Sequence, residues 1–206
     1  MPPETRPDRA GPVAGILLAA GTSSRMGRNK LLLELDGEPL LRRSARRALA
    51  GGLSPLIVVL GHQADSSRAL LCGLACRAVV NKDYEQGITS SLHAGLAVVP
   101  DEAAALVVML ADMPYVTAEM IAELIARYRA GAAPLAISDY EGVNAPPMLY
   151  DRSLFAELAA MQGGGCGRKV VQRHRAEAEV VAWPVLALTD LDVPEDYDRI
   201  REGGSP

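Results

Sequence analysis

The first apolar run of the chain reads Val13-Ala-Gly-Ile-Leu-Leu-Ala-Ala-Gly21, and it continues into Thr22-Ser-Ser-Arg-Met-Gly-Arg-Asn-Lys30. Its apolar part has the length of a buried strand. The residues that follow carry little side-chain bulk, so their backbone N–H groups can face a bound anion closely. Arg25 and Lys30 add fixed positive charge beside this loop. A strand, a small-residue loop and nearby cations together predict a phosphate-binding site.

The spacing of the glycines excludes two common phosphate motifs. A P-loop needs Gly-Lys-Ser/Thr after four intervening residues, whereas Gly21 is followed six residues later by Gly27-Arg-Asn-Lys30. Gly15 and Gly21 do not form the Gly-x-Gly-x-x-Gly pattern of dinucleotide-binding folds. A plain Gly/Ser-rich turn is the simpler alternative, but it leaves Arg25 and Lys30 unexplained. The chain has three lysines against eighteen arginines, so a lysine at position 30 favours a specific use of its compact charge.

Apolar runs alternate with amphipathic segments along the rest of the chain, which predicts a largely parallel three-layer α/β fold. Strands are expected at residues 55–60, 77–81, 105–111, 134–138, 148–150 and 180–183. Helices are expected at residues 39–50, 65–74, 117–130 and 153–161, with another running from a Ser90 or Ser91 cap to residue 99 and a short one after residue 196. Residues 139–147 are expected to form a loop, because they are rich in proline and small residues.

The most apolar run, residues 105–111, has no alternation and predicts a central parallel strand that is buried on both faces. Asp112 follows it directly, and a carboxylate at that end of a central strand points into the crevice where open α/β sheets bind ligands. Asp112 could instead cap the next turn, but Thr117 is already in position to cap the following helix.

The motif Leu18-Ala-Ala-Gly-Thr-Ser-Ser-Arg-Met-Gly-Arg-Asn-Lys30 resembles the signature of the molybdenum cofactor nucleotidyltransferases, and especially their cytidylyltransferase branch. The resemblance extends over about residues 13 to 200. It implies a three-layer Rossmann-like fold of the nucleotide-diphospho-sugar transferase type, with a mostly parallel central sheet and helices on both faces. It also implies that the loop wraps the phosphates of an NTP, and that Arg25 and Lys30 neutralise their charge. The residues implied to bind nucleotide in this loop are Leu18, Ala19, Ala20, Gly21, Ser24, Arg25, Gly27 and Lys30.

Three later stretches also resemble the family. By that resemblance, Asn81, Gly87 and Ser91 lie near the base and ribose, and Asp112 binds nucleotide and holds Mg²⁺ or Mn²⁺. Asp192 is implied as a second metal ligand, although clustered acids there could be ordinary helix N-terminal charge.

The glycine-rich stretch Gly163-Gly-Gly-Cys-Gly167, followed by Arg168-Lys169, is either a linker or a second anion site for the acceptor's phosphate. It lacks the acidic residue that the family commonly has among these glycines. Asn144-Ala-Pro-Pro147 stands where the family often has Gly-His-Pro. These departures leave the identity of the acceptor open.

The composition favours a single cytoplasmic domain. The chain of 206 residues is long enough for one core, and its net charge of −4 without a basic block argues against a nucleic-acid partner. No apolar run approaches the ~20 residues that cross a bilayer. Residues 1–12 are rich in proline and charge and lack a signal core, so we expect a flexible tail before a domain at 13–203. The odd count of three cysteines is consistent with reduced thiols.

The resulting hypothesis is an enzyme that transfers CMP from CTP to the molybdenum-molybdopterin cofactor and releases pyrophosphate. One alternative is cytidylyl, uridylyl or guanylyl transfer to another phosphorylated acceptor, such as a sugar or polyol phosphate. Another is a non-catalytic maturation factor that hands the cofactor to an apo-molybdoenzyme, which would then be a protein partner. Catalysis by charge neutralisation and positioning fits a sequence in which no Ser/His/Asp or Cys/His set stands out.

Overall fold

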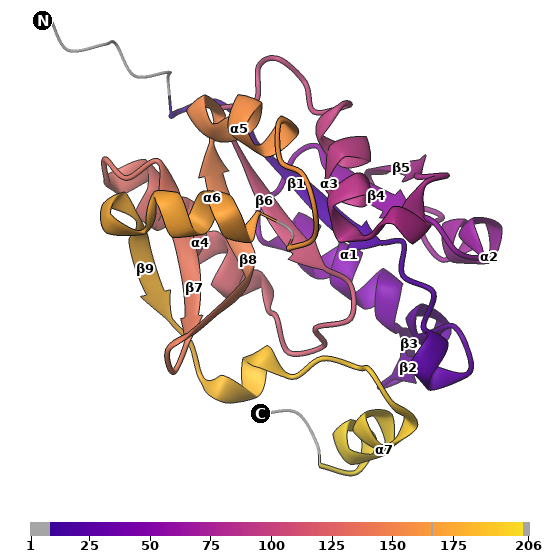
Figure 1. Ribbon diagram of the computed structural model, residues 1–206. Helices are drawn as coiled ribbons and strands as arrows, with labels where there is room; N and C mark the ends of the chain where they lie inside the picture. Colours follow the sequence, from indigo (N-terminus) through magenta and orange to yellow (C-terminus); the bar gives the residue numbers. More distant parts are fainter. Residues whose placement is uncertain (1–8, 166, 204–206) are drawn as a thin grey trace, which may run out of the picture.

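The computed structural model describes residues 9–165 and 167–203, and its centre is a seven-stranded sheet with strand order β5-β4-β1-β6-β8-β7-β9 (Figure 1). The strands of this sheet are β1 (Val13–Ala19), β4 (Leu56–Leu60), β5 (Cys76–Val80), β6 (Ala105–Leu110), β7 (Leu135–Tyr140), β8 (Val143–Asp151) and β9 (Glu179–Ala182). Strands β5, β4, β1 and β6 run parallel to one another, β9 runs parallel to β7, and β8 is antiparallel to both β6 and β7. The sheet is therefore mostly parallel, as the alternation of strands and helices predicts.

Helices cover both faces of the sheet, which confirms the three-layer expectation. The α-helices are α1 (Leu40–Ala50), α2 (Ala64–Ala69), α3 (Ile88–Leu96), α4 (Ala118–Ala130), α5 (Phe155–Ala159), α6 (Arg168–Arg173) and α7 (Pro194–Gly203). One core cluster joins the sheet to α1 and α4, and a second joins the opposite face to α3, α5 and α6. Side chains of β1 alternate between the two clusters, with Leu17 in the first and Ile16 and Leu18 in the second.

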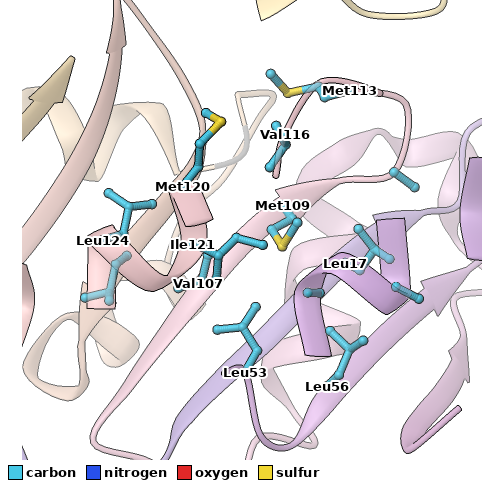
Figure 2. Close-up of a cluster of buried hydrophobic side chains, with 14 of the residues drawn as sticks. Leu17, Leu53, Leu56, Val107, Met109, Met113, Val116, Met120, Ile121 and Leu124 are labelled. Atoms are coloured by element: carbon cyan, nitrogen blue, oxygen red, sulfur yellow. The ribbon is translucent and has the colours of Figure 1, made fainter. Parts of the chain in front are cut away.

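Figure 2 shows the first of these clusters, in which Leu17 of β1 and Val107 and Met109 of β6 lie opposite Ile121 and Leu124 of α4. Strand β6 is buried on both faces, as predicted for residues 105–111, although only one of its neighbours is parallel. Helix α4 begins where expected, because the Thr117 side chain accepts a hydrogen bond from Met120 N.

Two local predictions are wrong. Residues 139–147 are not an open loop: most of them belong to β7 and β8, which pair as a hairpin. Within this range Asp139 pairs with Asn144 and Tyr140 pairs with Val143. The prolines conceal the strand, because Pro146 and Pro147 lie in β8 itself. Ser90 and Ser91 do not cap α3, which already begins at Ile88 after Gly87.

Short elements complete the domain. The small antiparallel pair β2 (Glu34–Leu35) and β3 (Glu38–Pro39) packs with α7 through a separate cluster of Leu35, Leu40, Leu191 and Ile200. Single 3₁₀ turns are η1 (Ser24–Met26), η2 (Lys30–Leu32), η3 (Tyr84–Gln86), η4 (Arg152–Leu154), η5 (Arg175–Glu177) and η6 (Val185–Leu188). Among residues 9–165 and 167–203, no helix has both the length and the apolar character that a bilayer crossing requires.

Arg9, the first described residue, contacts the end of α4. Its guanidinium donates to the carbonyl oxygens of Tyr128, Gly131, Ala132 and Ala133 and lies 4.5 Å from the centre of the Tyr128 ring. Residue 9 is thus docked on the end of α4, whereas residues 1–8 of the expected tail lie outside the described residues. The domain limits at 13–203 stay a prediction.

Candidate functional site

The loop after β1 is shaped by residues with left-handed backbone. Ser23 has φ 53° and Gly27 has φ 64°, one on each side of η1. Ser23 Oγ accepts a hydrogen bond from the backbone N–H of Lys30 at 3.2 Å, which closes the loop. A non-glycine residue held in this conformation is a local strain that often occurs at functional sites. The loop therefore returns Lys30 to the end of the strand that precedes it.

A cavity of about 180 Å³ lies between this loop and the carboxyl ends of β1 and β6. Its lining comprises Leu18, Ala19, Gly21, Thr22, Ser23, Ser24, Arg25, Lys30, Leu31, Asp112 and Asp192. Residues from positions 18, 112 and 192 thus meet around one space, although they are far apart in the sequence. Open α/β sheets bind ligands at this edge.

Charged side chains form a connected cluster in this cavity. Lys30 Nζ lies 2.7 Å from Asp112 Oδ2 and 3.0 Å from Asp192 Oδ1. The guanidinium of Arg25 reaches the other oxygen of Asp192 at 2.6 Å. The Lys30 side chain is 12% exposed, whereas that of Arg25 is 70% exposed, so the Lys30 pairs are much less screened by water.

The pKa of Lys30 is raised by this arrangement. Burial on its own disfavours the charged ammonium, but the Asp112 carboxylate and then the Asp192 carboxylate outweigh it. Lys30 is therefore a fixed positive charge at neutral pH. A fixed cation at a phosphate-sized cavity can neutralise negative charge that develops on a bound group.

Two separate segments deliver the carboxylates. Asp112 follows β6, and its backbone carbonyl accepts a hydrogen bond from Leu191 N at 3.0 Å. Asp192 is the residue after Leu191. Asp196 Oδ2 accepts hydrogen bonds from the backbone N–H groups of Asp192 and Val193, at 3.1 and 3.0 Å. The segment before α7 is thus held against the end of β6, which explains how Asp192 returns to the loop of β1.

The two carboxylates fit a divalent cation. Oxygens from both already converge on one cationic group, the Lys30 ammonium. The described residues contain no cluster of three or more His, Cys, Asp or Glu side chains suited to a metal. Mg²⁺ is commonly held by one or two carboxylates together with substrate phosphates and water. A pair of aspartates is therefore sufficient for a metal that binds together with a phosphorylated ligand.

A second cavity, of about 340 Å³, adjoins the first and shares Leu18, Gly21, Thr22 and Asp112 with it. Its other lining residues are Ala20, Tyr84, Glu85, Gly87, Ile88, Ser91 and Leu110. The predicted residues Gly87 and Ser91 thus line the same cavity as Ala20. The combined space is lined by the loop after β1 and by the start of α3.

Two predicted residues line neither cavity. Asn81 is buried, and its amide donates to Ser90 Oγ at 2.9 Å and to Ser91 Oγ at 3.0 Å. Asn81 therefore holds two serines in the first turn of α3, of which Ser91 lines the second cavity. Gly27 is the left-handed residue that ends η1.

Sequence reasoning missed several lining residues, namely Thr22, Ser23, Leu31, Tyr84, Glu85, Ile88 and Leu110. It also missed Asp190, whose pKa is raised by burial and then by the neighbouring charges of Asp192 and Asp112. Some of these residues could have been found from their position next to predicted site residues. Thr22 and Ser23 lie inside the predicted loop, and Tyr84 lies between Asn81 and Gly87. Asp190 is two residues before Asp192.

Comparison with known proteins identifies the family. A family model described as the MobA-like NTP transferase domain matches residues 15–178. The chain is 29% identical to the purine catabolism protein PucB of Bacillus subtilis, over 93% of this chain and 97% of that protein. It is 30% identical to the nicotine blue oxidoreductase of Paenarthrobacter nicotinovorans, over 92% of this chain and 94% of that protein.

Solved structures give the same result for the fold. The crystal structure of Rv0371c from Mycobacterium tuberculosis H37Rv has a TM-score of 0.81 and 28% identity, covering 94% of this chain and 99% of that one. A structure of Rv0371c in complex with manganese has a TM-score of 0.77, again at 28% identity, covering 94% of this chain and 100% of that one. With the family model extending over most of the chain, the protein belongs to the MobA-like NTP transferase family and is a nucleotidyltransferase.

Proposed function

We propose that this enzyme transfers CMP from CTP to the phosphate of the molybdenum-molybdopterin cofactor and releases pyrophosphate. The observation that carries the proposal is the Lys30 ammonium between Asp112 and Asp192, beside the small-residue loop after β1. Such a site offers N–H groups, a fixed cation and a pair of carboxylates to a triphosphate.

The reaction needs no protein nucleophile. An oxygen of the acceptor's phosphate attacks the α-phosphorus of CTP, and the bond from that phosphorus to the bridging oxygen of pyrophosphate breaks. A phosphate monoester has a second pKa of ~6, so at neutral pH its attacking oxygen is already largely deprotonated. Arg25 and Lys30 would neutralise the charge that moves onto the leaving pyrophosphate.

Asp112 and Asp192 are the residues that would hold a divalent cation, Mg²⁺ or Mn²⁺, with the triphosphate. The bound cation would supply further positive charge to the phosphate oxygens. Support comes from the convergence of both carboxylates on one cationic group and from the manganese complex of Rv0371c.

The preference for CTP rests on Ala20 in the second cavity. A methyl group at this position would leave less room beside Gly87 and Ser91, which would disfavour a two-ring purine more than a pyrimidine. One methyl-sized contact discriminates by only ~1–3 kcal/mol, so polar groups at the start of α3 would have to contribute. The resemblance to the cytidylyltransferase branch, with Leu18-Ala-Ala-Gly21, supports the same choice.

The acceptor is supported by the resemblance of the loop motif to the molybdenum cofactor nucleotidyltransferases. The nicotine blue oxidoreductase at 30% identity offers a second candidate, an oxidoreductase activity. Redox chemistry releases no pyrophosphate, so one assay separates the two.

The decisive experiment measures pyrophosphate release from CTP, GTP, ATP and UTP with molybdopterin, with sugar and polyol phosphates, and without acceptor. We expect release with CTP and molybdopterin that depends on Mg²⁺ or Mn²⁺. A preference for GTP or ATP would overturn the cytidylyl assignment. A preference for another phosphorylated acceptor would leave the assignment of CTP intact and would overturn the assignment of molybdopterin as the acceptor. No release with any pair would remove the transferase reaction in favour of a maturation factor or an oxidoreductase.

A further inference from the structure

A cavity of about 450 Å³ lies at the opposite end of the sheet from the nucleotide cavities, and its volume is in the range of small-molecule sites. We call it the α3–α5 groove, because residues of both helices line it together with Asp101 and Arg152. Asp101 precedes β6 and Asp112 follows it, so the groove and the nucleotide cavities lie at opposite ends of that strand. In Figure 1, α3 and α5 lie toward the top of the molecule, whereas α7 and the β2–β3 pair lie toward its lower end.

The walls of the α3–α5 groove are mostly apolar. Leu96, Val99 and Phe155 are half-buried and pack against the core cluster on this face of the sheet. Phe155 is the only phenylalanine of the chain, and a residue of this type is more often fully buried than left at a surface cavity. Small side chains keep the space between the two helices open, namely Ala97, Ala156 and Ala159. The groove therefore offers an aromatic ring and open apolar surface to a flat ligand.

Arg152 supplies a cation whose position is fixed. Its Nη1 donates to the carbonyl oxygens of Pro100 at 3.3 Å and Ala103 at 3.1 Å. Its guanidinium carbon lies 5.5 Å from the centre of the Phe155 ring. Its Nη2 donates to Asp101 Oδ1 at 3.0 Å, and within residues 9–165 and 167–203 its Nε donates to no side chain or carbonyl. The edge formed by Nε and Nη2 is therefore only partly used.

That edge has the geometry that holds a carboxylate. Arg46 shows the pairing in the same chain, because its Nε and Nη2 donate to the two oxygens of Glu38 at 3.0 and 2.9 Å. Arg152 makes one such bond, to Asp101, whose side chain is fully exposed. An ion pair with an exposed carboxylate contributes little to stability. A ligand carboxylate can therefore displace Asp101 and accept from both nitrogens of Arg152.

His93 adds a hydrogen-bond acceptor to the groove. Its Nε2 lies 3.1 Å from the carbonyl oxygen of Leu158, and a carbonyl accepts, so Nε2 carries the proton. In the neutral imidazole, Nδ1 is then an acceptor that a hydroxyl or N–H group of a ligand can use. The groove thus combines a donor pair for a carboxylate, an aromatic wall and an acceptor.

We propose that the α3–α5 groove is a separate ligand site that binds an aromatic carboxylate. The ring of the ligand packs against Phe155, and its carboxylate accepts from Nε and Nη2 of Arg152. Asp101 competes with the ligand for the same guanidinium. The proposal does not depend on the transfer reaction, because in the described part of the chain the groove shares no lining residue with the nucleotide cavities.

The test titrates two fluorescent probes into the full chain, 6-hydroxy-2-naphthoate and its uncharged amide, 6-hydroxy-2-naphthamide, and follows fluorescence anisotropy. The parent should bind the naphthoate roughly ten-fold more tightly than the amide, which is the lower end of what a hydrogen bond to a charged group contributes. Arg152→Gln should abolish this preference. Asp101→Asn should tighten naphthoate binding several-fold, because it removes the competing carboxylate. Glu102→Gln is the matched control, since Glu102 is the exposed neighbour of Asp101 and does not line the groove.

Ala156→Leu tests the location of the site without removing a charged contact. A leucine at this exposed position of α5 would occupy the groove and should weaken both probes by roughly ten-fold. Ala160→Leu is its control, because Ala160 is exposed at the end of the same helix and does not line the groove. Asp101→Asn and Ala156→Leu change exposed positions, so they decide the matter even if Arg152→Gln disturbs the carbonyls that Arg152 holds.

Three results would each overturn the proposal. The first is equal binding of the acid and the amide by the parent, including no binding of either. The second is unchanged affinity for both probes in Ala156→Leu. The third is competitive displacement of the naphthoate by CTP, which would place the probe in the nucleotide cavities.

Discussion

The Lys30 ammonium contacts both of the carboxylates that the proposed function assigns to a divalent cation. A cation cannot approach Asp112 and Asp192 closely while Lys30 remains between them. We infer that Lys30 moves toward the phosphates when an NTP binds, which frees the carboxylates. The same side chain would then control both metal affinity and charge on the leaving group.

The first prediction concerns metal affinity in the absence of nucleotide. Lys30→Met should bind Mn²⁺ several-fold more tightly than the parent, since it removes a positive charge about 3 Å from both carboxylates. Electron paramagnetic resonance of free Mn²⁺ measures this directly. Arg25→Met is the comparison, because Arg25 pairs with Asp192 alone and is mostly exposed, so its effect should be smaller. Weaker Mn²⁺ binding by Lys30→Met would contradict the competition.

The second prediction concerns turnover. Lys30→Ala should lower kcat by roughly 10²–10³-fold, comparable to loss of a group that stabilises developing charge, and should weaken CTP binding much less. Single-turnover pyrophosphate release and equilibrium CTP binding separate the two quantities. Equal losses in both would leave Lys30 as a group that binds the ground state only.

A third prediction at this scale concerns Asp192. Asp192→Asn keeps the size of the side chain but removes its charge, so the Mg²⁺ concentration that gives half-maximal activity should rise. Asp112→Asn should abolish activity. If the Mg²⁺ titration of Asp192→Asn is unchanged, Asp192 is not a metal ligand. Its role would then be limited to the ion pairs with Arg25 and Lys30.

At the residue scale, the sequence marks those residues that stand beside a local pattern. Arg25, Lys30 and Asp112 follow a small-residue loop or a strand end, and the structure brings them to one cavity. Tyr84, Leu110 and Asp190 come near the site through the packing of η3, β6 and residues 190–193, and no local sequence pattern marks that approach.

Helix α3 shows the same distinction at the scale of elements. Its existence was predictable from sequence, but its start was not, because Ser90 and Ser91 are held from outside by Asn81 rather than used as caps. The β7–β8 hairpin was concealed in a similar way. Its prolines favour a loop when the sequence is considered alone. In the structure β8 nevertheless forms a strand, because it pairs with β6 on one side and with β7 on the other.

The fourth prediction follows from how closely α3 approaches the sheet. A Cβ at Gly95 would lie 2.8 Å from Ile16 Cγ2 and 3.0 Å from Val59 Cγ2, both buried. Gly95→Ala should therefore destabilise by about 1–2 kcal/mol, because overpacking of ~1–3 kcal/mol exceeds the helix-propensity gain of up to ~1 kcal/mol. Thermal or urea unfolding measures it. Gly164→Ala, where nothing lies within 4 Å of the new Cβ, is the control and should change stability little.

A stabilised Gly95→Ala protein would mean that the sheet yields to the extra methyl group. The position is informative for function as well, since α3 also carries Ser91 into the second cavity. A shift of α3 away from β1 would be expected to raise the KM for CTP.

At the scale of the whole molecule, the site is assembled by opposite ends of the chain. Lys30 lies near the start, Asp112 in the middle and Asp192 near the end, and the last of these depends on a small separate core. That core, made of Leu35, Leu40, Leu191 and Ile200, joins α7 to the β2–β3 pair just after the loop of β1. A three-layer sheet fold was predictable from the order of the elements. The folding back of residues 190–200 onto residue 112 was suggested only by resemblance, because it is a contact of high sequence separation.

The last prediction is a linkage between nucleotide binding and the docking of α7. If Asp192 binds the metal together with the triphosphate, the ligands bind more tightly when residues 191–200 are docked. Ligand binding must then stabilise the docked conformation by that difference in affinity. Backbone N–H groups of this segment, including those of Asp192 and Val193 that donate to Asp196, should exchange with solvent more slowly when CTP and Mn²⁺ are both present. Hydrogen exchange measured by mass spectrometry gives the readout, with β4 as an internal reference because it is fully buried in the sheet. Asp192→Asn should still bind CTP at a higher CTP concentration, but it should lose most of the added protection. Ile200→Ala should raise both the exchange rate of residues 191–200 and the Mg²⁺ concentration that activity requires. Equal protection in the parent and in Asp192→Asn would mean that residues 191–200 pack against the site without binding the metal or the nucleotide.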